Sequence, residues 1–411
     1  MATVAPNLLR NEPMRRDPRT FQPFLRLARL LADVAPGRSP LASGLPINMA
    51  VGDPQQPAPA LLAETVAAHP DGWSSYPPFR GTPDYQRAAV GWLARRYGLP
   101  EGLVDGERNL LPIPGSREGL FFAALSALSA GAAEGRDCVL LPAPGYHVYA
   151  GAAAAAGAEP VFVPVTRASG FLPDYAALDP AILRRAAIAF VCSPSNPEGA
   201  AADLPRWRDL LALARRHGFV LAADECYAEI YVGAPPAGAL QAAAETGSLD
   251  GLLAFHSLSK RSNAAGLRCG FLAGESALVD TVDAFCRFGG ASVPLPIQQA
   301  GAALWNDDAH AEANRAFYAR LFERAEATLG GRFGWHKPAG GFFLWLEVGD
   351  DEAAALRLWR EAGIRTLPGS YMVADAHLQP NPAAGFLRVA LVHDESVTGP
   401  ALERLVELLD G

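Results

Sequence analysis

The sequence predicts an α/β protein, with a mostly parallel central sheet in a large domain and a small α+β domain beside it. Between about residues 109 and 274, short apolar segments alternate with helical patterns, which is typical of a parallel sheet covered by helices. The apolar segments are hydrophobic at successive positions, as expected of strands buried on both faces. The length of 411 residues also exceeds what one hydrophobic core usually holds, so we expect two domains.

The elements of the large domain follow from these patterns. Strands are expected at 109–113, 138–141, 160–165, 187–192, 220–223, 252–256 and 270–273. Helices are expected at 117–130, 146–156 and 205–217. In such sheets, ligands bind beyond the carboxyl ends of the strands, so the loops after these segments are the expected location of a site.

The small domain is expected to use both ends of the chain. We assign residues 1–55 to its N-terminal segment, residues 56–295 to the large domain and residues 296–411 to its C-terminal part, with the proline-rich stretch 293–296 as the junction. This last part is predicted to contain a long helix at 297–329, strands at 342–348 and 386–391, and a final helix at 397–409.

The composition excludes several classes of protein. A formal net charge of −8 argues against a nucleic-acid binder, which would need a basic surface. Residues 1–29 contain no apolar run suited to a signal peptide, and no stretch approaches the roughly 20 apolar residues that span a bilayer. The five cysteines are scattered without a CxxC pair, which favours a reducing compartment and neither disulfides nor a metal site. We therefore expect a cytoplasmic protein.

Lysine is scarce in this chain. Only Lys260 and Lys337 are lysines among 35 basic residues, and the other 33 are arginines. Arginine serves equally well as a surface charge, so a retained lysine points to a task that arginine cannot perform, such as forming an imine or acting as a neutral base. Lys337 lies in a predicted turn and is interpreted as an ordinary surface residue.

The first loop of interest follows the strand at 109–113. It contains Gly115 and Ser116 directly before a predicted helix. A helix N-terminus offers backbone N–H groups and a positive dipole end to an anion. The pattern is compatible with phosphate binding, although a simple helix cap is the commoner explanation.

Polar residues also follow two further strands. Asn196 lies in an Asn-Pro turn, either as a turn former or as an amide directed at a ligand. Asp224 ends an apolar strand, where an ionised carboxylate is costly unless a cation faces it. It caps a helix or it faces the cationic ring nitrogen of a cofactor, and Tyr227 places a hydroxyl nearby.

The strand at 252–256 runs into two serines and Lys260, with Arg261 and Arg268 further along. The neighbouring arginines should lower the pKa of the lysine amine, which favours the uncharged form needed for imine chemistry. Together, the four loops supply an anion cradle, a carboxylate for a pyridinium nitrogen, an amide and a hydroxyl for a phenolate oxygen, and an amine for an aldehyde. These are the groups that pyridoxal 5′-phosphate (PLP) requires.

Over nearly its whole length the chain resembles the fold type I, class I and II PLP-dependent aminotransferases. The resemblance is most specific in segment 257–270 and in the Asp224-x-x-Tyr227 motif. It implies that Lys260 binds the cofactor as a Schiff base and later moves a proton, and that Asp224 keeps the pyridine nitrogen protonated. It also implies that Asn196 and Tyr227 form hydrogen bonds with the cofactor's phenolate oxygen.

The same resemblance assigns further contacts. The phosphate is expected to be held by Ser116, the backbone of Arg117, Ser257, Ser259 and Arg268. Tyr146 matches the aromatic residue that stacks on the ring, and Tyr76 matches the tyrosine that reaches the partner subunit's phosphate, which implies a homodimer. Substrate contacts are expected from Gly52, Asn196 and Arg388, of which Arg388 would bind the α-carboxylate with both arms of its guanidinium.

Several stretches resemble N-succinyl-L,L-diaminopimelate aminotransferases of lysine biosynthesis in particular, namely 224–231, 238–242, 255–263, 305–310 and 367–370. Glutamate and 2-oxoglutarate are then the expected second amino and keto pair. Two residues depart from the family pattern. Glu198 stands where threonine is usual and adds a negative charge near an anionic cofactor, and Cys269 replaces an aliphatic residue.

Three alternatives remain open at this point. Other class I and II aminotransferases, of the aspartate, aromatic or N-acetylornithine type, share these motifs, and so does a PLP-dependent C–S β-lyase or decarboxylase. A non-catalytic regulator would carry a fused winged-helix segment, and none fits before Gly52. For the distal end of the substrate, Arg80, Arg261 and Arg287 are candidates by charge only.

Overall fold

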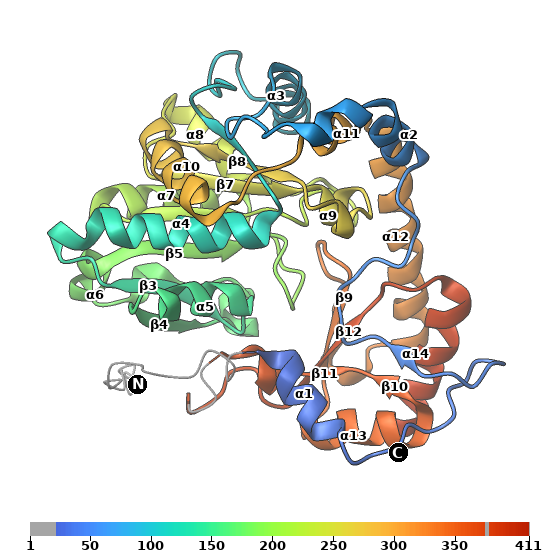
Figure 1. Cartoon of the computed structure of the whole chain (residues 1–411). Helices are drawn as coiled ribbons and strands as arrows, with labels where there is room; N and C mark the ends of the chain where they lie inside the picture. Colours follow the sequence, from blue (N-terminus) through green and yellow to red (C-terminus); the bar gives the residue numbers. More distant parts are fainter. Residues whose placement is uncertain (1–21, 375–377, 411) are drawn as a thin grey trace.

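A seven-stranded sheet forms the centre of the large part of the molecule (Figure 1). The structure is a computed structural model that describes residues 22–374 and 378–410, so most of the predicted segment 1–29 lies outside the described residues. The strands of this sheet are β2 (Leu110–Ile113), β3 (Cys138–Ala143), β4 (Glu159–Pro164), β5 (Ala186–Cys192), β6 (Val220–Asp224), β7 (Leu252–Ser257) and β8 (Gly270–Gly274). Their bounds agree with the predicted ones to within two residues.

The sheet has the order β2-β8-β7-β6-β5-β3-β4. Strands β3 to β7 pair in parallel, whereas β8 is antiparallel to both of its neighbours. As a result, the first residue of β8, Gly270, pairs with the last residue of β7, Ser257. The segment between them therefore leaves and re-enters the sheet at the same edge, the one at which the other strands end.

Helices cover both faces of the sheet, as the runs of apolar residues predict. One face carries α4 (Ser116–Gly131), α5 (His147–Ala155) and α10 (Ser276–Gly289), and the other carries α3 (Pro83–Tyr97), α7 (Leu204–His217), α8 (Ala239–Thr246) and α11 (Leu295–Asn306). Successive residues such as Val139 and Leu140 belong to the opposite hydrophobic cores, which explains why the strands show no polar alternation. Shorter helices are α2 (Ala60–Ala68), α6 (Pro180–Arg185) and α9 (Leu258–Arg261).

The smaller part of the molecule lies at the lower right of Figure 1 and has its own core. Strands β9 (Phe343–Glu347), β11 (Leu367–Pro368) and β12 (Phe386–Ala390) form an antiparallel sheet, and β1 (Ile47–Asn48) pairs in parallel with β10 (Ile364–Arg365). Its helices are α1 (Pro23–Leu31), α12 (Ala309–Leu329), α13 (Asp351–Ala362) and α14 (Glu395–Leu409). No helix in the described part of the chain is long and apolar enough to cross a membrane.

The single long helix predicted at 297–329 is wrong, because two helices occupy this stretch. Helix α11 ends at Asn306, since the next residue, Asp307, adopts an extended conformation (φ −100°, ψ 106°), and α12 begins at Ala309. The buried guanidinium of Arg261 donates to the carbonyl oxygens of Leu304 and Asp307, at 2.7 and 3.1 Å. It thereby binds carbonyl groups that a continuous helix would have paired internally. Helix α11 packs on α2 and α3, and the domain boundaries at residues 55 and 295 stay a prediction.

Candidate active site

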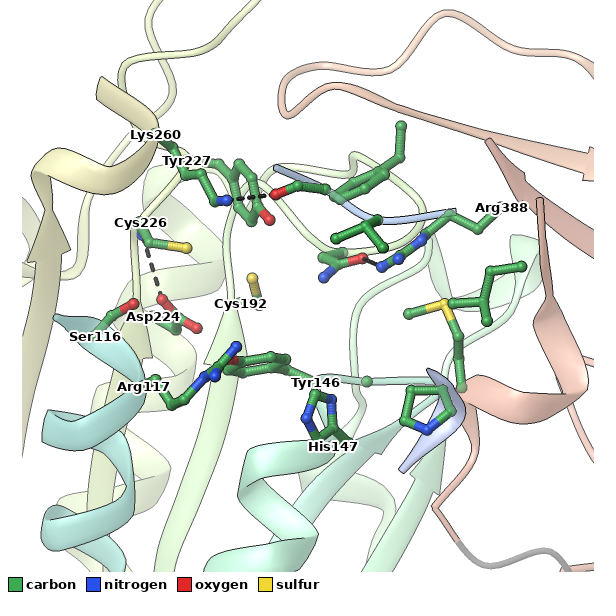
Figure 2. A pocket seen from close by; sticks show the side chains of 18 of the residues that line it. Ser116, Arg117, Tyr146, His147, Cys192, Asp224, Cys226, Tyr227, Lys260 and Arg388 are labelled. Atoms are coloured by element: carbon green, nitrogen blue, oxygen red, sulfur yellow. Dashed lines mark hydrogen bonds between the residues drawn. The ribbon is translucent and has the colours of Figure 1, made fainter. Parts of the chain in front are cut away.

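A cavity lies at the carboxyl edge of the large sheet, where it faces the smaller part of the molecule (Figure 2). It comprises about 790 Å³ of space, including its open mouth. Nine of the predicted site residues line it: Gly52, Ser116, Arg117, Tyr146, Asn196, Asp224, Tyr227, Lys260 and Arg388. Residues from seven separate segments of the chain thus meet in one place, and the strand order explains why most of them do.

Three of the residues expected at the phosphate lie beside the cavity without lining it. The hydroxyl of Ser257 accepts from the backbone N–H of Ser259 at 3.2 Å and caps the short helix α9. Arg268 Nη2 donates to Glu118 Oε2 at 2.6 Å, on the first turn of α4. The guanidinium approaches Gly115 (φ 132°) so closely that a Cβ there would lie 2.5 Å from Nη2. A hydroxyl pair, a guanidinium and a helix N-terminus are therefore adjacent, a donor set that fits a phosphate group.

The amine of Lys260 points into the cavity. Its Nζ donates to the carbonyl oxygen of Gly52 at 2.5 Å, and burial lowers its pKa to about 8. The direction agrees with the prediction, but the cause differs. Burial has the largest effect, and the nearby cations that add to it are Arg388 and Arg117; Arg261, expected to be one of them, points away from the cavity. Roughly half of the amines are uncharged near pH 8, which suits imine chemistry.

Asp224 is a buried carboxylate without a cationic partner among the described residues. It is 2% exposed, Tyr149 Oη donates to its Oδ2 at 2.7 Å, and the backbone N–H of Cys226 donates to its Oδ1 at 3.3 Å. Burial raises its pKa, while these two hydrogen bonds act in the opposite direction. The helix-cap interpretation does not hold, because no helix begins at this residue. A carboxylate in this setting fits the cationic ring nitrogen of PLP.

We predict that replacing Tyr149 with Phe slows turnover by about 10-fold, the effect expected of one hydrogen bond to a charged group. Because the Tyr149 hydroxyl lowers the pKa of Asp224, its loss raises that pKa, and the fall of kcat on the acidic side should begin at a higher pH. A kcat profile against pH measures this shift. Tyr175→Phe is the matched control, since this buried hydroxyl donates to the Phe190 carbonyl at 2.6 Å, outside the cavity. An unshifted acid limb in Tyr149→Phe would contradict the prediction.

Three further predicted residues form the cavity wall around Asp224. The hydroxyl of Tyr146 accepts from Arg117 Nε at 2.8 Å, and its ring is drawn in the middle of the cavity in Figure 2. Tyr227 is 5% exposed and packs edge-to-face on Phe342. Asn196 lies opposite, in the turn after β5.

Arg388, on β12, is a buried guanidinium that lacks a carboxylate partner among the described residues. It is 4% exposed, and burial lowers its pKa to about 10. Its Nη1 donates to Asn196 Oδ1 at 2.9 Å and its Nη2 to the carbonyl oxygen of Ala50 at 2.6 Å, whereas Nε has no partner. Without the family resemblance, we would have interpreted this residue as an ordinary arginine of a strand. Its position and its unmatched charge fit a substrate carboxylate.

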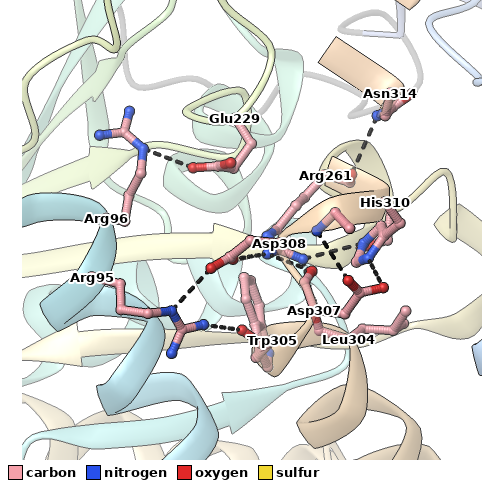
Figure 3. A network of polar contacts seen from close by, with 12 residues as sticks. Arg95, Arg96, Glu229, Arg261, Leu304, Trp305, Asp307, Asp308, His310 and Asn314 are labelled. Atoms are coloured by element: carbon pink, nitrogen blue, oxygen red, sulfur yellow. Dashed lines mark hydrogen bonds and ion pairs between the residues drawn. The ribbon is translucent and has the colours of Figure 1, made fainter. Parts of the chain in front are cut away.

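The three arginines considered for the distal end of the substrate do not line the cavity. Arg80 pairs with Asp280 and Asp283, and Arg287 also pairs with Asp283. Figure 3 shows Arg261 in a polar network at the junction of α11 and α12. Charge alone was the wrong criterion, because each of these guanidinium groups already has carboxylate partners.

Sequence reasoning missed several residues that line the cavity or lie directly behind it. These are Tyr149 beneath Asp224, the thiols of Cys192 and Cys226, His147, and the apolar group formed by Pro23, Phe24, Val51, Phe343, Leu367 and Met372. For Tyr149 a signal existed, because it lies three residues after Tyr146, which directly precedes α5, and the two rings pack edge-to-face. No local signal marks Phe24 or Met372, which reach the cavity only through the packing of the smaller part.

The fold and this set of donors define the class of the protein as a fold type I PLP-dependent enzyme. The model of the family described as aminotransferase class I and II matches residues 46–405. The chain belongs to this family and is a PLP-dependent aminotransferase. The cofactor and the reaction class expected from the motifs are thereby confirmed.

Characterised relatives share about a third of their residues with the chain. The 4-dedimethylamino-4-oxo-anhydrotetracycline transaminase of Streptomyces rimosus is 37% identical over 328 residues, which cover 79% of this chain and 85% of the relative. The LL-diaminopimelate aminotransferase of Syntrophobacter fumaroxidans is 31% identical over 374 residues, covering 88% and 91%.

Solved structures agree with the fold. An aminotransferase from Neisseria meningitidis superimposes with a TM-score of 0.87 at 36% identity, covering 94% of this chain and 97% of the other. A probable N-succinyldiaminopimelate aminotransferase from Thermus thermophilus gives a TM-score of 0.80 at 26% identity, covering 94% and 100%.

Proposed function

We propose that the chain transfers the amino group of N-succinyl-L,L-diaminopimelate to 2-oxoglutarate, a reaction of lysine biosynthesis. The observation that carries the proposal is Arg388, a buried guanidinium that has no carboxylate partner among the described residues and lines the same cavity as the amine of Lys260. An amino acid held by its carboxylate at Arg388 has its α-amino group within that cavity. The relatives named for LL-diaminopimelate and N-succinyldiaminopimelate support the choice of substrate.

In this proposal the residues around the cavity hold PLP. Asp224 faces the ring nitrogen, Asn196 and Tyr227 face the phenolate oxygen, and Tyr146 stacks on the ring. The phosphate group is held by Ser116, the backbone N–H of Arg117, Ser257, Ser259 and Arg268. When bound, PLP supplies an aldehyde that combines with amino groups and a cationic ring that withdraws electrons from the reacting carbon.

The protein's own side chains then perform the remaining tasks. The amine of Lys260, whose pKa burial lowers to about 8, accepts and returns a proton at the substrate's reacting carbon. The carboxylate of Asp224 stabilises positive charge at the ring nitrogen, and Tyr149 orients that carboxylate through its 2.7 Å hydrogen bond. The apolar side chains of Phe24 and Met372 restrict access of water from the side of the smaller part.

The distal, succinylated end of the substrate needs a second cation, and Arg117 is the candidate. Its side chain lines the cavity, and its Nε donates to the uncharged hydroxyl of Tyr146. The adjacent carboxylate of Glu118 binds Arg268 instead. Glutamate and N-succinyl-diaminopimelate each carry a carboxylate at both ends, which matches a cavity with guanidinium groups at Arg388 and Arg117.

The test is a half-reaction followed by a substrate comparison. Glutamate should convert the bound cofactor to its amine form, which is seen as a change in the absorption spectrum; no conversion would contradict the aminotransferase and favour a β-lyase or decarboxylase. Among N-succinyl-L,L-diaminopimelate, L,L-diaminopimelate, N-acetylornithine and aspartate, we expect the highest kcat/KM for the succinylated substrate. If another of these four compounds had a higher kcat/KM, it would replace the succinylated compound as the assigned substrate, and the reaction class would stay the same.

A second candidate is the amination of a polycyclic ketone. It is favoured by the apolar wall of Phe24, Phe343, Leu367 and Met372 and by the name of the relative from Streptomyces rimosus. Both candidates share the glutamate half-reaction and differ in the second half-reaction. Return of the amine form to the aldehyde form by a bulky aromatic ketone, faster than by 2-oxoglutarate, would favour this alternative.

The proposed assembly is a homodimer. Tyr76, which the family resemblance directs at the partner subunit, is fully exposed, and Trp73 and Phe288 are exposed at 55% and 93%. Exposed aromatic side chains of this kind are enriched at protein interfaces. Light scattering on the purified protein should give twice the mass of the chain.

A further inference from the structure

Glu198 occupies an unusual position for a carboxyl group. It lies in the turn after β5, two residues from Asn196, and is 2% exposed. The hydroxyl of Ser195 donates to its Oε2 at 3.0 Å, while its Oε1 has no hydrogen-bond partner among the described residues. An unpaired carboxyl oxygen in a protein interior is costly and calls for an explanation.

Within the described part of the chain, no cation lies close enough to Glu198 to stabilise a negative charge there. The side chains that share its small pocket are mainly apolar, among them Pro144, Phe171 and Leu172. The titratable groups near it are Cys192, which shares the pocket and whose pKa is raised, and His336, which lies next to the Glu198 backbone and whose pKa is lowered by burial. Both are therefore uncharged at neutral pH.

Two charged groups beside this pocket, Arg167 and Glu347, are paired with each other, and Arg388 binds Asn196 rather than Glu198. The guanidinium of Arg167 lies 5.6 Å from the ring centre of Phe171, and it binds Glu347 Oε1 at 2.6 Å. Burial raises the pKa of Glu198 to about 8. The extra negative charge that the sequence suggested beside the cofactor is consequently absent at neutral pH.

The turn that holds Glu198 connects both halves of the site. Ser193 N–H donates to the carbonyl oxygen of Asp224 at 3.0 Å, and Asn196 Oδ1 accepts from Arg388. The carbonyl oxygen of Gly199 accepts from the N–H of Ala339 at 2.9 Å. Gly199 has φ 72°, and a Cβ there would lie 2.4 Å from Pro338, so this end of the turn is tightly packed on the smaller part.

We propose that Glu198 is a positioning residue for the reaction: as an uncharged carboxylic acid it fixes the Ser195–Asn196 turn and, through Asn196, the guanidinium of Arg388. It touches neither substrate nor cofactor. Ionisation places an uncompensated charge inside the turn, which must shift to hydrate it, and Arg388 loses its alignment. This inference rests on the proposed role of Arg388 in substrate binding.

The first test compares the wild-type holoenzyme with Glu198→Gln, in which the amide imitates the uncharged acid. Above about pH 8 the KM of the wild type for glutamate should rise severalfold more than that of Glu198→Gln, with kcat changing alike in both. The amino group of the substrate titrates identically in the two reactions, so the difference between them isolates Glu198. Superimposable KM profiles would overturn the proposal.

The second test measures stability and does not depend on substrate binding. The pKa of Glu198 is higher in the fold than in the unfolded chain, so the folded state binds more protons and loses stability as pH rises from about 4.5 to about 8. The Tm of Glu198→Gln should therefore exceed that of the wild type at alkaline pH and converge with it at acidic pH. An equal Tm difference at every pH would show that folding does not raise the pKa of Glu198, and it would overturn the proposal.

Two further variants separate this inference from the proposed function. Glu403→Gln removes an exposed carboxylate on α14 that pairs with Arg324 and lies outside this pocket, and it should leave both profiles as in the wild type; a change like that of Glu198→Gln would point to general charge effects and contradict the proposal. Glu198→Ala should raise KM with little change in kcat, and a folded variant with wild-type KM would contradict it too. If instead Arg388→Ala left KM unchanged, the proposed function would fail, while the Tm comparison would still report on Glu198.

Discussion

Replacing Lys260 with Ala is expected to abolish turnover while PLP still binds through its phosphate and ring contacts. One general acid–base group contributes up to about 10⁴-fold to a rate, and Lys260 also supplies the amine that binds the cofactor, so we expect a loss of at least that size. Lys260→Arg should be equally inactive, because a guanidinium does not release its proton at any working pH. Single-turnover kinetics with glutamate measures the residual rate.

The scarcity of lysine makes this experiment unusually clear. Borohydride reduction of the holoenzyme should attach the cofactor permanently to one lysine, and the chain offers only Lys260 and Lys337. Lys337 pairs with Glu326 on the surface, so Lys337→Ala should be labelled and active like the wild type. Mass spectrometry of the reduced proteins distinguishes the cases. Labelling of Lys260→Ala, or turnover near the wild-type rate, would show that the assignment is wrong.

The second large effect is expected for Arg388→Ala, which should weaken amino-acid substrates far more than it weakens PLP. Loss of one partner from a buried charge pair costs about 2–5 kcal/mol, so kcat/KM for glutamate should fall by a factor of roughly 30 to several thousand. Arg388→Lys retains the charge but loses the two-armed geometry and should recover only part of this loss. Steady-state kinetics and a PLP titration provide the two measurements.

Arg287→Ala is the matched control for this experiment. Arg287 is also an arginine of a structured element, but it pairs with Asp283 on the same helix and does not line the cavity. Its replacement should leave KM and PLP affinity unchanged. An unchanged KM in Arg388→Ala would remove this residue from carboxylate binding, and a large loss of PLP affinity would assign it to the cofactor instead.

The sequence was sufficient for the parts of the fold that depend on local pattern. Strands buried on both faces produce uninterrupted apolar segments, so β5, β6 and β7 were located to within one residue. The direction of β8 leaves no such pattern, because antiparallel and parallel strands of a covered sheet have the same composition. The break between α11 and α12 was also hidden, since it depends on Arg261, a residue 43 positions from Leu304.

The candidate site likewise consists of residues that local sequence patterns reveal and residues that they do not. Asp224, Asn196 and Lys260 stand at strand ends, where the topology of an open sheet brings polar groups together, and they could be proposed before the family resemblance was considered. Arg388 and Gly52 come from the smaller part, whose orientation no local pattern predicts. Arg80 was a wrong candidate for a related reason, because the carboxylates that neutralise it lie about 200 residues away along the chain. The partner of Arg287, by contrast, lies only four residues away on the same helix.

The hydrogen bond between Lys260 Nζ and the Gly52 carbonyl must break before the lysine amine can react. An amine that donates to this carbonyl has to release it before it can react, and the loop around Gly52 is also the one expected near the substrate carboxylate. In the free chain this hydrogen bond therefore restrains both the loop around Gly52 and the side chain of Lys260. Asn314 on α12 holds the backbone carbonyl of the same lysine at 2.9 Å, so release frees only the tip of the side chain while its base stays fixed.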